Sequence, residues 1–136
     1  MSAAIRLLHI VDDNELDRWV FRKQMLNAAS VNQVEESANG EDAKSFLEQC
    51  LQPGHAVPEL ILIDVHLPGE VDGWELLAWI RKQPKLERTK VVLFTFSPQL
   101  QTQPAEFVED SAATIHAKPI TQEVAQAIAA WFGGLS

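Results

Sequence analysis

The stretch Leu60-Ile61-Leu62-Ile63-Asp64 decides the fold of this chain. Four aliphatic residues in a row favour a short strand that is buried on both faces, as the strands of a parallel sheet are. The run ends on a carboxylate, which has no place in an apolar layer unless it is paired. Because sites in open parallel sheets form at the carboxyl ends of the strands, Asp64 is the first candidate for a functional residue.

Strand-like and helix-like segments alternate along the rest of the chain. Their apolar periodicity, with Gly and Pro as breaks, predicts strands at residues 5–11, 31–37, 60–64, 90–95 and 114–117. It predicts helices at about residues 16–26, 41–50, 73–83 and 124–131, and a short or irregular one between residues 98 and 110. Five such repeats predict an α/β fold with a doubly wound, five-stranded parallel sheet and helices on both faces.

The strand order and the helix faces follow from the same patterns. The second predicted strand ends without a chemically capable residue, which suits an edge strand and the order 2-1-3-4-5. Apolar spacing predicts the buried helix faces. They are Leu16, Trp19, Val20 and residues 23–26 in the first helix, and Val124, Ala127, Ile128 and Trp131 in the last.

Length and composition limit the class of protein. The 136 residues suffice for one domain, which we expect to span residues 1–136 without an output domain. A net charge of −8 disfavours binding to nucleic acid or to an anionic membrane. The lone Cys50 cannot form an internal disulfide, residues 1–8 lack the pattern of a secretory leader, and no apolar stretch approaches the ~20 residues of a membrane span. We therefore expect a cytoplasmic protein.

Chemically capable side chains stand at the ends of four predicted strands. They are Asp12 and Asp13 after the first strand, Asp64 at the end of the third, Thr95 at the end of the fourth and Lys118 after the fifth. An acidic pair at a strand exit is by itself usually a turn or a helix cap. Because the ends of parallel strands meet at one edge, the four elements together predict one site.

The three carboxylates require a compensating charge. Pairs among Asp12, Asp13 and Asp64 would repel one another by roughly 1–4 kcal/mol at ~4 Å, so a cation is expected, and hard carboxylate oxygens suit Mg²⁺. Thr95 and Lys118 supply a hydroxyl donor and a positive charge, which suit phosphoryl oxygens. A carboxylate can be the nucleophile for such a group, so the pattern predicts phosphoryl capture as an aspartyl phosphate.

Over nearly its whole length the chain resembles the receiver domain of two-component response regulators, which have a flavodoxin-like fold. The matching landmarks are Asp12-Asp13, Asn39-Gly40-Glu41-Asp42-Ala43, Ile63-Asp64-Val65-His66-Leu67-Pro68-Gly69, Asp72-Gly73, Thr95 and Lys118-Pro119, in this order. Residues 52–58 and 81–90 are also weakly similar to stand-alone receivers that partner bacterial phytochromes.

The resemblance implies that Asp64 accepts a phosphoryl group from a histidine kinase or a histidine phosphotransfer protein. It implies Mg²⁺ bound directly by Asp13 and Asp64, mainly through water by Asp12, and by the backbone carbonyl of His66. Such a protein is no enzyme in its own right, because it assists only its own phosphorylation and dephosphorylation. It signals through protein–protein contacts to a downstream effector. The residues implied to contact the phosphoryl oxygens are Thr95 and Lys118.

Three features depart from the family pattern. Phe96 stands where a small residue is usual, so its ring would hinder access to the phosphoacceptor. Ile115 replaces the family's switch aromatic, so the usual coupling of a threonine motion to a turning ring cannot operate in that form. The loop at residues 68–72 is one residue longer than is commonest.

Two other functions stay open. A receiver that is rarely or never phosphorylated could still act as a binding module that docks a partner through its helices. A hydrolase of the dehalogenase type also uses an aspartyl phosphate, but it would need a second acid two residues after the nucleophile, where this chain has His66.

The resemblance also implies surfaces for partners. Donors would dock on Asn14, Leu16, Trp19 and residues 119–121, although periodicity makes Leu16 and Trp19 mainly core. A homodimer would use the elements that carry Phe107, Ile115 and Trp131, and of these we expect Trp131 to be buried.

Overall fold

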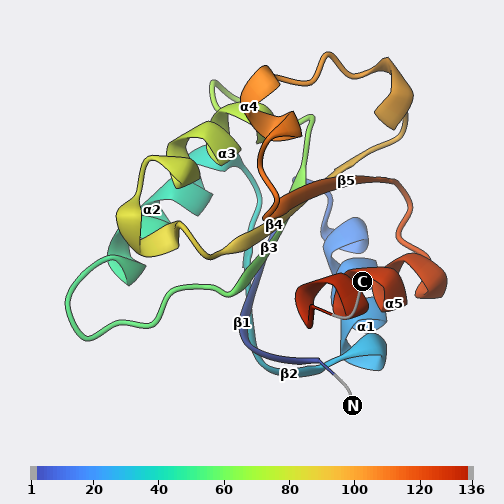
Figure 1. Ribbon diagram of the computed structural model, residues 1–136, viewed down its shortest axis with the longest axis horizontal. Coiled ribbons are helices and arrows are strands. Elements are labelled where there is room, and N and C mark those ends of the chain that lie inside the picture. Colours follow the sequence, from blue (N-terminus) through green and yellow to red (C-terminus); the bar gives the residue numbers. More distant parts are fainter. Residues whose placement is uncertain (1–2, 135–136) are drawn as a thin grey trace.

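The computed structural model describes residues 3–134 as one sheet of five strands with helices on both faces (Figure 1). The order is β2-β1-β3-β4-β5, and every neighbouring pair is parallel. The predicted fold class and strand order are confirmed. The expectation that one domain extends to residue 136 without an output domain stays a prediction, because residues 135–136 lie outside the described residues. The strands are β1 (Ala4–Val11), β2 (Ser30–Ser37), β3 (Leu60–Asp64), β4 (Lys90–Thr95) and β5 (Ala113–Ala117).

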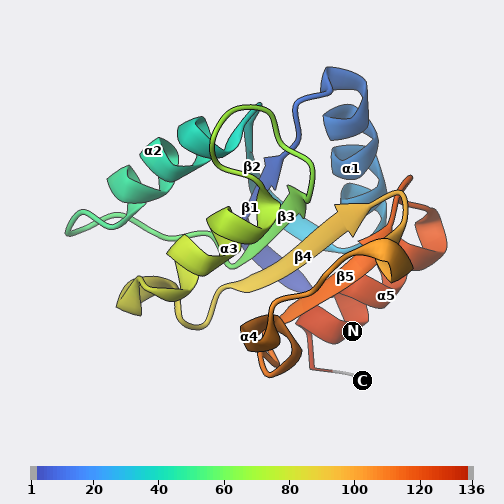
Figure 2. The same ribbon diagram turned by 90° about the horizontal axis from the view of Figure 1, so that it is seen from above.

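The helices form one layer on each side of the sheet. On one face lie α1 (Glu15–Ala28) and α5 (Gln122–Phe132), and on the other lie α2 (Gly40–Cys50), α3 (Gly73–Arg81) and the short α4 (Ala105–Val108) (Figures 1 and 2). Single 3₁₀ turns occupy Pro84–Leu86 and Pro98–Leu100. The segment between residues 98 and 110 is thus short and irregular, as its two prolines predict. None of the described helices has the length and apolar character of a membrane span.

Strand β3 shows how the sheet separates two apolar cores. Leu60 and Leu62 belong to the core under α1 and α5, whereas Ile61 and Ile63 belong to the core under α2 and α3. This alternation arises because successive side chains of a strand point to opposite faces. Burial of each such side chain stabilises the fold by about 1.5–3 kcal/mol. The run therefore holds both helical layers and places Asp64 at the end of the sheet.

Side-chain caps fix the loops that follow the strands. Asn14 Oδ1 accepts a hydrogen bond from the Asp17 backbone N–H at 2.9 Å, which starts α1 directly after β1. Asp72 caps α3 as predicted, and it forms a reciprocal capping box with Glu75. Each cap contributes about 1 kcal/mol and sets where its helix begins.

The buried side of α1 differs from the prediction. Leu16 and Trp19 are 68% and 55% exposed, so the expectation that they belong to the core is wrong. The buried residues are Phe21 and Met25, and the Phe21 ring centroid lies 4.7 Å from that of Phe94 in β4. The helix has apolar residues on two sides, and the side with this i, i+4 pair faces the sheet.

The buried face of α5 is also shifted from the prediction. Small alanines let the helix approach the sheet, so the bulky Trp131 lies at the rim, with the Lys90 ammonium 4.9 Å from its ring centroid. Trp131 is half-buried rather than buried. Of the predicted face, Ile128 is buried, Val124 is half-buried and Ala127 is exposed; the other buried residues are Ala125 and Ala129.

Candidate functional site

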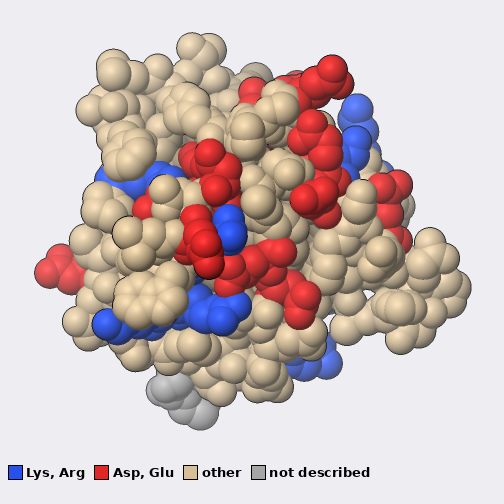
Figure 3. All heavy atoms as spheres, turned by 180° about the vertical axis from the view of Figure 1, so that it is seen from behind, with Lys and Arg blue, Asp and Glu red and all other residues tan. Residues whose placement is uncertain are grey.

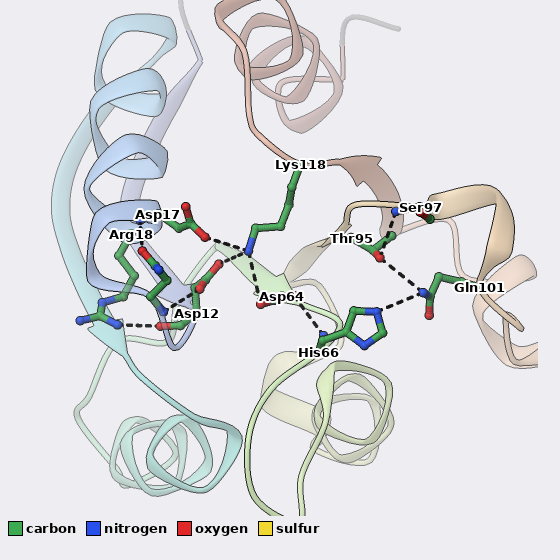
Figure 4. Close-up of polar contacts among 10 residues, drawn as sticks. Asp12, Asp17, Arg18, Asp64, His66, Thr95, Ser97, Gln101 and Lys118 are labelled. Atoms are coloured by element: carbon green, nitrogen blue, oxygen red, sulfur yellow. Dashed lines mark hydrogen bonds and ion pairs between the residues drawn. The ribbon is translucent and has the colours of Figure 1, made fainter.

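The ends of β3 and β4 and the loops after β1 and β5 bring the predicted residues to one end of the sheet (Figure 4). Asp12 and Asp64 are buried, and Asp13 is exposed. One carboxylate oxygen from each of the three lies within 4.8 Å of the other two. The acidic cluster expected from the sequence is therefore present in the fold. It joins Asp12 and Asp64, which are 52 residues apart in the sequence.

Lys118 lies at the centre of this cluster. Its Nζ is 2.7 Å from Asp12 Oδ2 and 3.3 Å from Asp64 Oδ2. The Lys118 backbone N–H donates to the Thr95 carbonyl oxygen at 2.8 Å, which ties the end of β5 to the end of β4. The peptide bond between Lys118 and Pro119 is cis. The ammonium partly neutralises the two buried carboxylates that it joins.

Asp17 is a site residue that the sequence analysis missed. Its Oδ2 lies 3.1 Å from Lys118 Nζ, so the ammonium contacts three carboxylates at once. Asp17 lies in the first turn of α1, directly after the loop that carries Asp12 and Asp13. Asp17 follows Asp13 by four residues and lies just inside a helix that starts at the end of the sheet. This position is the signal that could have revealed it.

Burial and charge act against each other in this cluster. Burial raises the pKa of Asp12, and the hydrogen bond and charge of Lys118 oppose that rise. For Lys118, burial alone would lower the pKa of the ammonium, but the hydrogen bond and charge of Asp12, together with Asp64, reverse this and raise it. Lys118 is therefore a fixed positive charge at neutral pH.

Thr95 and His66 lie on the other side of Asp64. The Thr95 hydroxyl is buried, and its oxygen accepts from the Ser97 backbone N–H at 3.4 Å and from Gln101 Nε2 at 3.3 Å. The His66 backbone N–H donates to Asp64 Oδ1 at 3.0 Å, while its side chain is exposed and approaches Gln101. Gln101, in the loop between β4 and α4, is a second neighbour of the site that no sequence pattern indicated.

The three departures from the family pattern have clear positions in the fold. Phe96 is 71% exposed, and its ring centroid lies 5.4 Å from Lys118 Nζ, so the ring borders the site; whether it slows access stays a prediction. Ile115 is half-buried in β5 against the core under α3. The longer loop turns at Gly69 with φ of +87° and packs on α2, where Glu41 accepts from the Glu70 backbone N–H.

The surface around the site is acidic. Figure 3 shows a face on which Asp and Glu side chains gather around a small basic spot, in keeping with a chain of net charge −8. Phe96 borders the site, and the apolar side chains of Leu16 and Trp19 on α1 are exposed as well. This mixture of acidic and apolar surface suits a divalent cation and a protein partner better than nucleic acid.

Comparisons with known proteins agree with this geometry. The model of the response regulator receiver domain family matches residues 8–129. Response regulator Rcp1 from Synechocystis is 30% identical over 93 residues, which are 68% of this chain and 63% of that protein. The chain spans 58 to 63% of the length of the curated relatives that it matches.

Two solved structures show the same fold. A Mn²⁺-bound form of Rcp1 has a TM-score of 0.70 at 24% identity and covers 94% of each chain. The phosphorylated cyanobacterial phytochrome response regulator RcpA has a TM-score of 0.71 at 24% identity, covering 95% of this chain and 94% of that one. Since receiver domains bind a divalent cation at an acidic pocket, the cluster of Asp12, Asp13 and Asp64 fits that role.

Receiver domains are signalling modules rather than enzymes in the ordinary sense, and they interact with histidine kinases and phosphotransfer proteins. The family match covers most of the sheet and the helices, and the cluster at the strand ends has the composition that such a module requires. The chain belongs to the response regulator receiver domain family.

Proposed function

We propose that this protein accepts a phosphoryl group on Asp64 from a histidine kinase or a histidine phosphotransfer protein and passes the signal on through protein contacts. The observation that carries the proposal is the position of Lys118, whose Nζ lies 2.7 Å from Asp12 and 3.3 Å from Asp64. The Lys118 ammonium lies between a candidate metal ligand, Asp12, and the candidate nucleophile, Asp64. It can stabilise the negative charge on the Asp64 carboxylate before the transfer and the negative charge on the phosphoryl oxygens after it.

The transfer is a displacement at phosphorus. A carboxylate oxygen of Asp64 attacks the phosphorus of a phosphohistidine, the new P–O bond forms, the P–N bond breaks, and the donor imidazole leaves and takes a proton. Lys118 donates to a phosphoryl oxygen through the ammonium that now contacts Asp64. Thr95, at the adjacent strand end, donates its hydroxyl proton to another.

Mg²⁺ would be held by Asp12, Asp13, Asp64 and the backbone carbonyl of His66. When bound, the ion supplies positive charge that offsets the anionic oxygens of the phosphoryl group. The donor set fits, because one carboxylate oxygen from each of the three aspartates lies within 4.8 Å of the other two, and such hard oxygens suit Mg²⁺. Rcp1 has been solved in a Mn²⁺-bound form and RcpA in a phosphorylated form, and both findings support the proposal that this chain takes a divalent cation and a phosphoryl group.

The exposed apolar residues beside the site fit the docking surface of a donor. Leu16 and Trp19 lie in the first two turns of α1, next to the acidic cluster, and Phe96 follows β4. We assign the donor contact to these residues together with Asn14 and residues 119–121, and we place the phosphoryl transfer in the cytoplasm.

A homodimer through the elements that carry Phe107, Ile115 and Trp131 is a further proposal. Loss of the phosphoryl group by attack of water would be assisted by the same site residues.

The proposal predicts that a small phosphodonor with Mg²⁺ modifies Asp64. Acetyl phosphate should add one phosphoryl group to the wild type, seen by intact mass, and none to Asp64→Asn, which keeps the shape and removes the nucleophile. Asp42→Asn is the matched control, because Asp42 is an exposed residue of the first turn of α2 and is not one of the three clustered carboxylates. Chelation of Mg²⁺ should abolish the labelling.

The labelling measurement also distinguishes phosphoryl transfer on Asp64 from the alternative of a binding module. A wild type that stays unmodified by acetyl phosphate and by a phosphorylated phosphotransfer protein would favour a binding module. Labelling that persists in Asp64→Asn would contradict Asp64 as acceptor.

A further inference from the structure

Gln101 joins the site to α3 through one side-chain amide (Figure 4). Its Nε2 donates to Thr95 Oγ1 at 3.3 Å and lies 3.3 Å from His66 Nε2. Its Oε1 accepts from the indole Nε1–H of Trp74, in the first turn of α3, at 3.4 Å. Three residues, from a strand end, a loop and a helix, therefore meet on a single planar group.

The hydrogen bonds at Thr95 leave its proton free. A hydroxyl has two lone pairs and one O–H hydrogen. The Ser97 backbone N–H and the Gln101 amide both donate to the oxygen, so they use the lone pairs. The proton must then point elsewhere, and the strand end on which Thr95 lies is adjacent to that of Asp64. An amide donor at this place thus orients the threonine as a donor.

Trp74 extends this connection to the surface. Its ring packs edge to face against Phe107 in α4, with centroids 5.1 Å apart. Both rings line a depression of about 430 Å³ between α3 and α4 together with Arg81 and Lys82. A shift of Gln101 therefore changes the indole environment and the contact between two surface helices.

We propose that Gln101 is a positioning residue that orients the Thr95 hydroxyl toward the phosphoryl group on Asp64 and couples its displacement to Trp74. This inference rests on the proposed function, since it needs a phosphoryl group at Asp64. All three contacts of the amide are 3.3–3.4 Å long, beyond the ~2.9–3.0 Å of an ideal N–H···O bond, so a small movement of Thr95 can break or tighten them.

In a different role, the hydrogen bonds of Gln101 would only hold the loop between β4 and α4 in place, without influencing the site. The two roles differ in what they do to Trp74, because a residue that only holds its loop keeps the indole contact whether or not Asp64 is phosphorylated. Coupling requires that the indole environment changes when the phosphoryl group forms.

The test measures labelling and tryptophan emission on the same samples. Intact mass gives the rate of phosphorylation by acetyl phosphate, and the Trp74 signal is the emission of each protein minus that of its Trp74→Phe counterpart. Gln101→Met removes the hydrogen bonds to Thr95 and Trp74 and the polar contact with His66, at similar side-chain size. Gln101→Glu keeps an acceptor for the indole but cannot donate to Thr95 when ionised. Gln103→Met, an exposed position in the same loop, is the matched control.

We expect the Trp74 signal of the wild type and of Gln103→Met to change on phosphorylation. In Gln101→Met and Gln101→Glu the change should be lost, and labelling should slow by about 2- to 10-fold, the value of one neutral hydrogen bond. Labelling without a change in Trp74, or a change that survives in Gln101→Met, would overturn the coupling. A wild type that is never labelled would instead refute the proposed function, which the mass measurement reports independently.

Discussion

The Lys118 ammonium contacts three carboxylates at the end of the sheet, those of Asp12, Asp17 and Asp64. Asp12, Asp64 and Lys118 stand directly at strand ends, so alternation of strands and helices suffices to gather them. Asp17 and Gln101 enter from a helix turn and an irregular loop, and their positions depend on cap geometry and loop path. No periodicity encodes these, so the sequence could not assign them.

The third carboxylate at Lys118 predicts an effect of charge on phosphoryl transfer. Asp17→Asn keeps an oxygen acceptor for Lys118 but removes a negative charge beside the path of an anionic donor. Labelling by acetyl phosphate should become about two- to five-fold faster at low ionic strength, and the difference should shrink in about 0.5 M salt. The labelling rate by intact mass checks this.

Glu48→Gln on α2 makes the same change of charge at an exposed position and serves as the control. A slower rate in Asp17→Asn would mean that the carboxylate serves mainly to hold the ammonium in place.

Whole elements were more predictable where both faces are buried. β3 and β4 follow from unbroken apolar runs, and both have the predicted bounds. The buried face of α1 was not predictable with the same reliability, because Leu16 and Trp19 compete with Phe21 and Met25 for the core. Exposed apolar residues of this kind are expected where a partner binds, so the periodicity argument fails at the surface that we propose for donor docking.

The Arg81 guanidinium joins the end of α3 to the loop before β5. Arg81 donates from Nε to Asp110 Oδ2 at 2.6 Å and from its Nη atoms to the carbonyl oxygens of Leu86, Thr89 and Ala112 at 2.9–3.2 Å. Arg81→Met would leave these acceptors without their donor. The expected loss is about 2–4 kcal/mol of unfolding free energy, because several partly buried groups lose a charged partner.

Urea unfolding checks this prediction, with Lys82→Met as the control. Lys82 is exposed beside Arg81, so its replacement should change the unfolding free energy by no more than about 0.5 kcal/mol. Equal effects of the two substitutions would show that the carbonyl contacts of Arg81 contribute little.

The whole molecule should lose stability on mild acidification because of a histidine in its core. His9 is fully buried in β1, stacks on Phe46 and shares a 2.9 Å hydrogen bond with Ser37, while its Nδ1 has no partner among the described residues. Burial lowers the pKa of His9 from 6.5 to about 4. Between these values the unfolded chain binds more protons than the folded one, so stability is full above pH 6.5 and falls as the pH falls toward 4.

The contribution of His9 over this window is about 3 kcal/mol, since one pKa unit corresponds to about 1.4 kcal/mol. Urea unfolding at a series of pH values should therefore give a smaller fall for His9→Gln, which can still bond to Ser37. His116 also has its pKa lowered by burial and acts in the same direction, so the comparison of wild type with His9→Gln isolates the one residue. Parallel profiles would contradict the assignment.

The alternation in β3, with leucines toward one helical layer and isoleucines toward the other, has a consequence for how such a protein changes over generations. Substitutions that refit α1 and α5 to a new donor at the proposed docking surface need no adjustment of the side chains beneath α2 and α3, because the sheet lies between the two cores. A lineage can thus change one helical layer while the other stays as it is, with Asp64 at the boundary common to both.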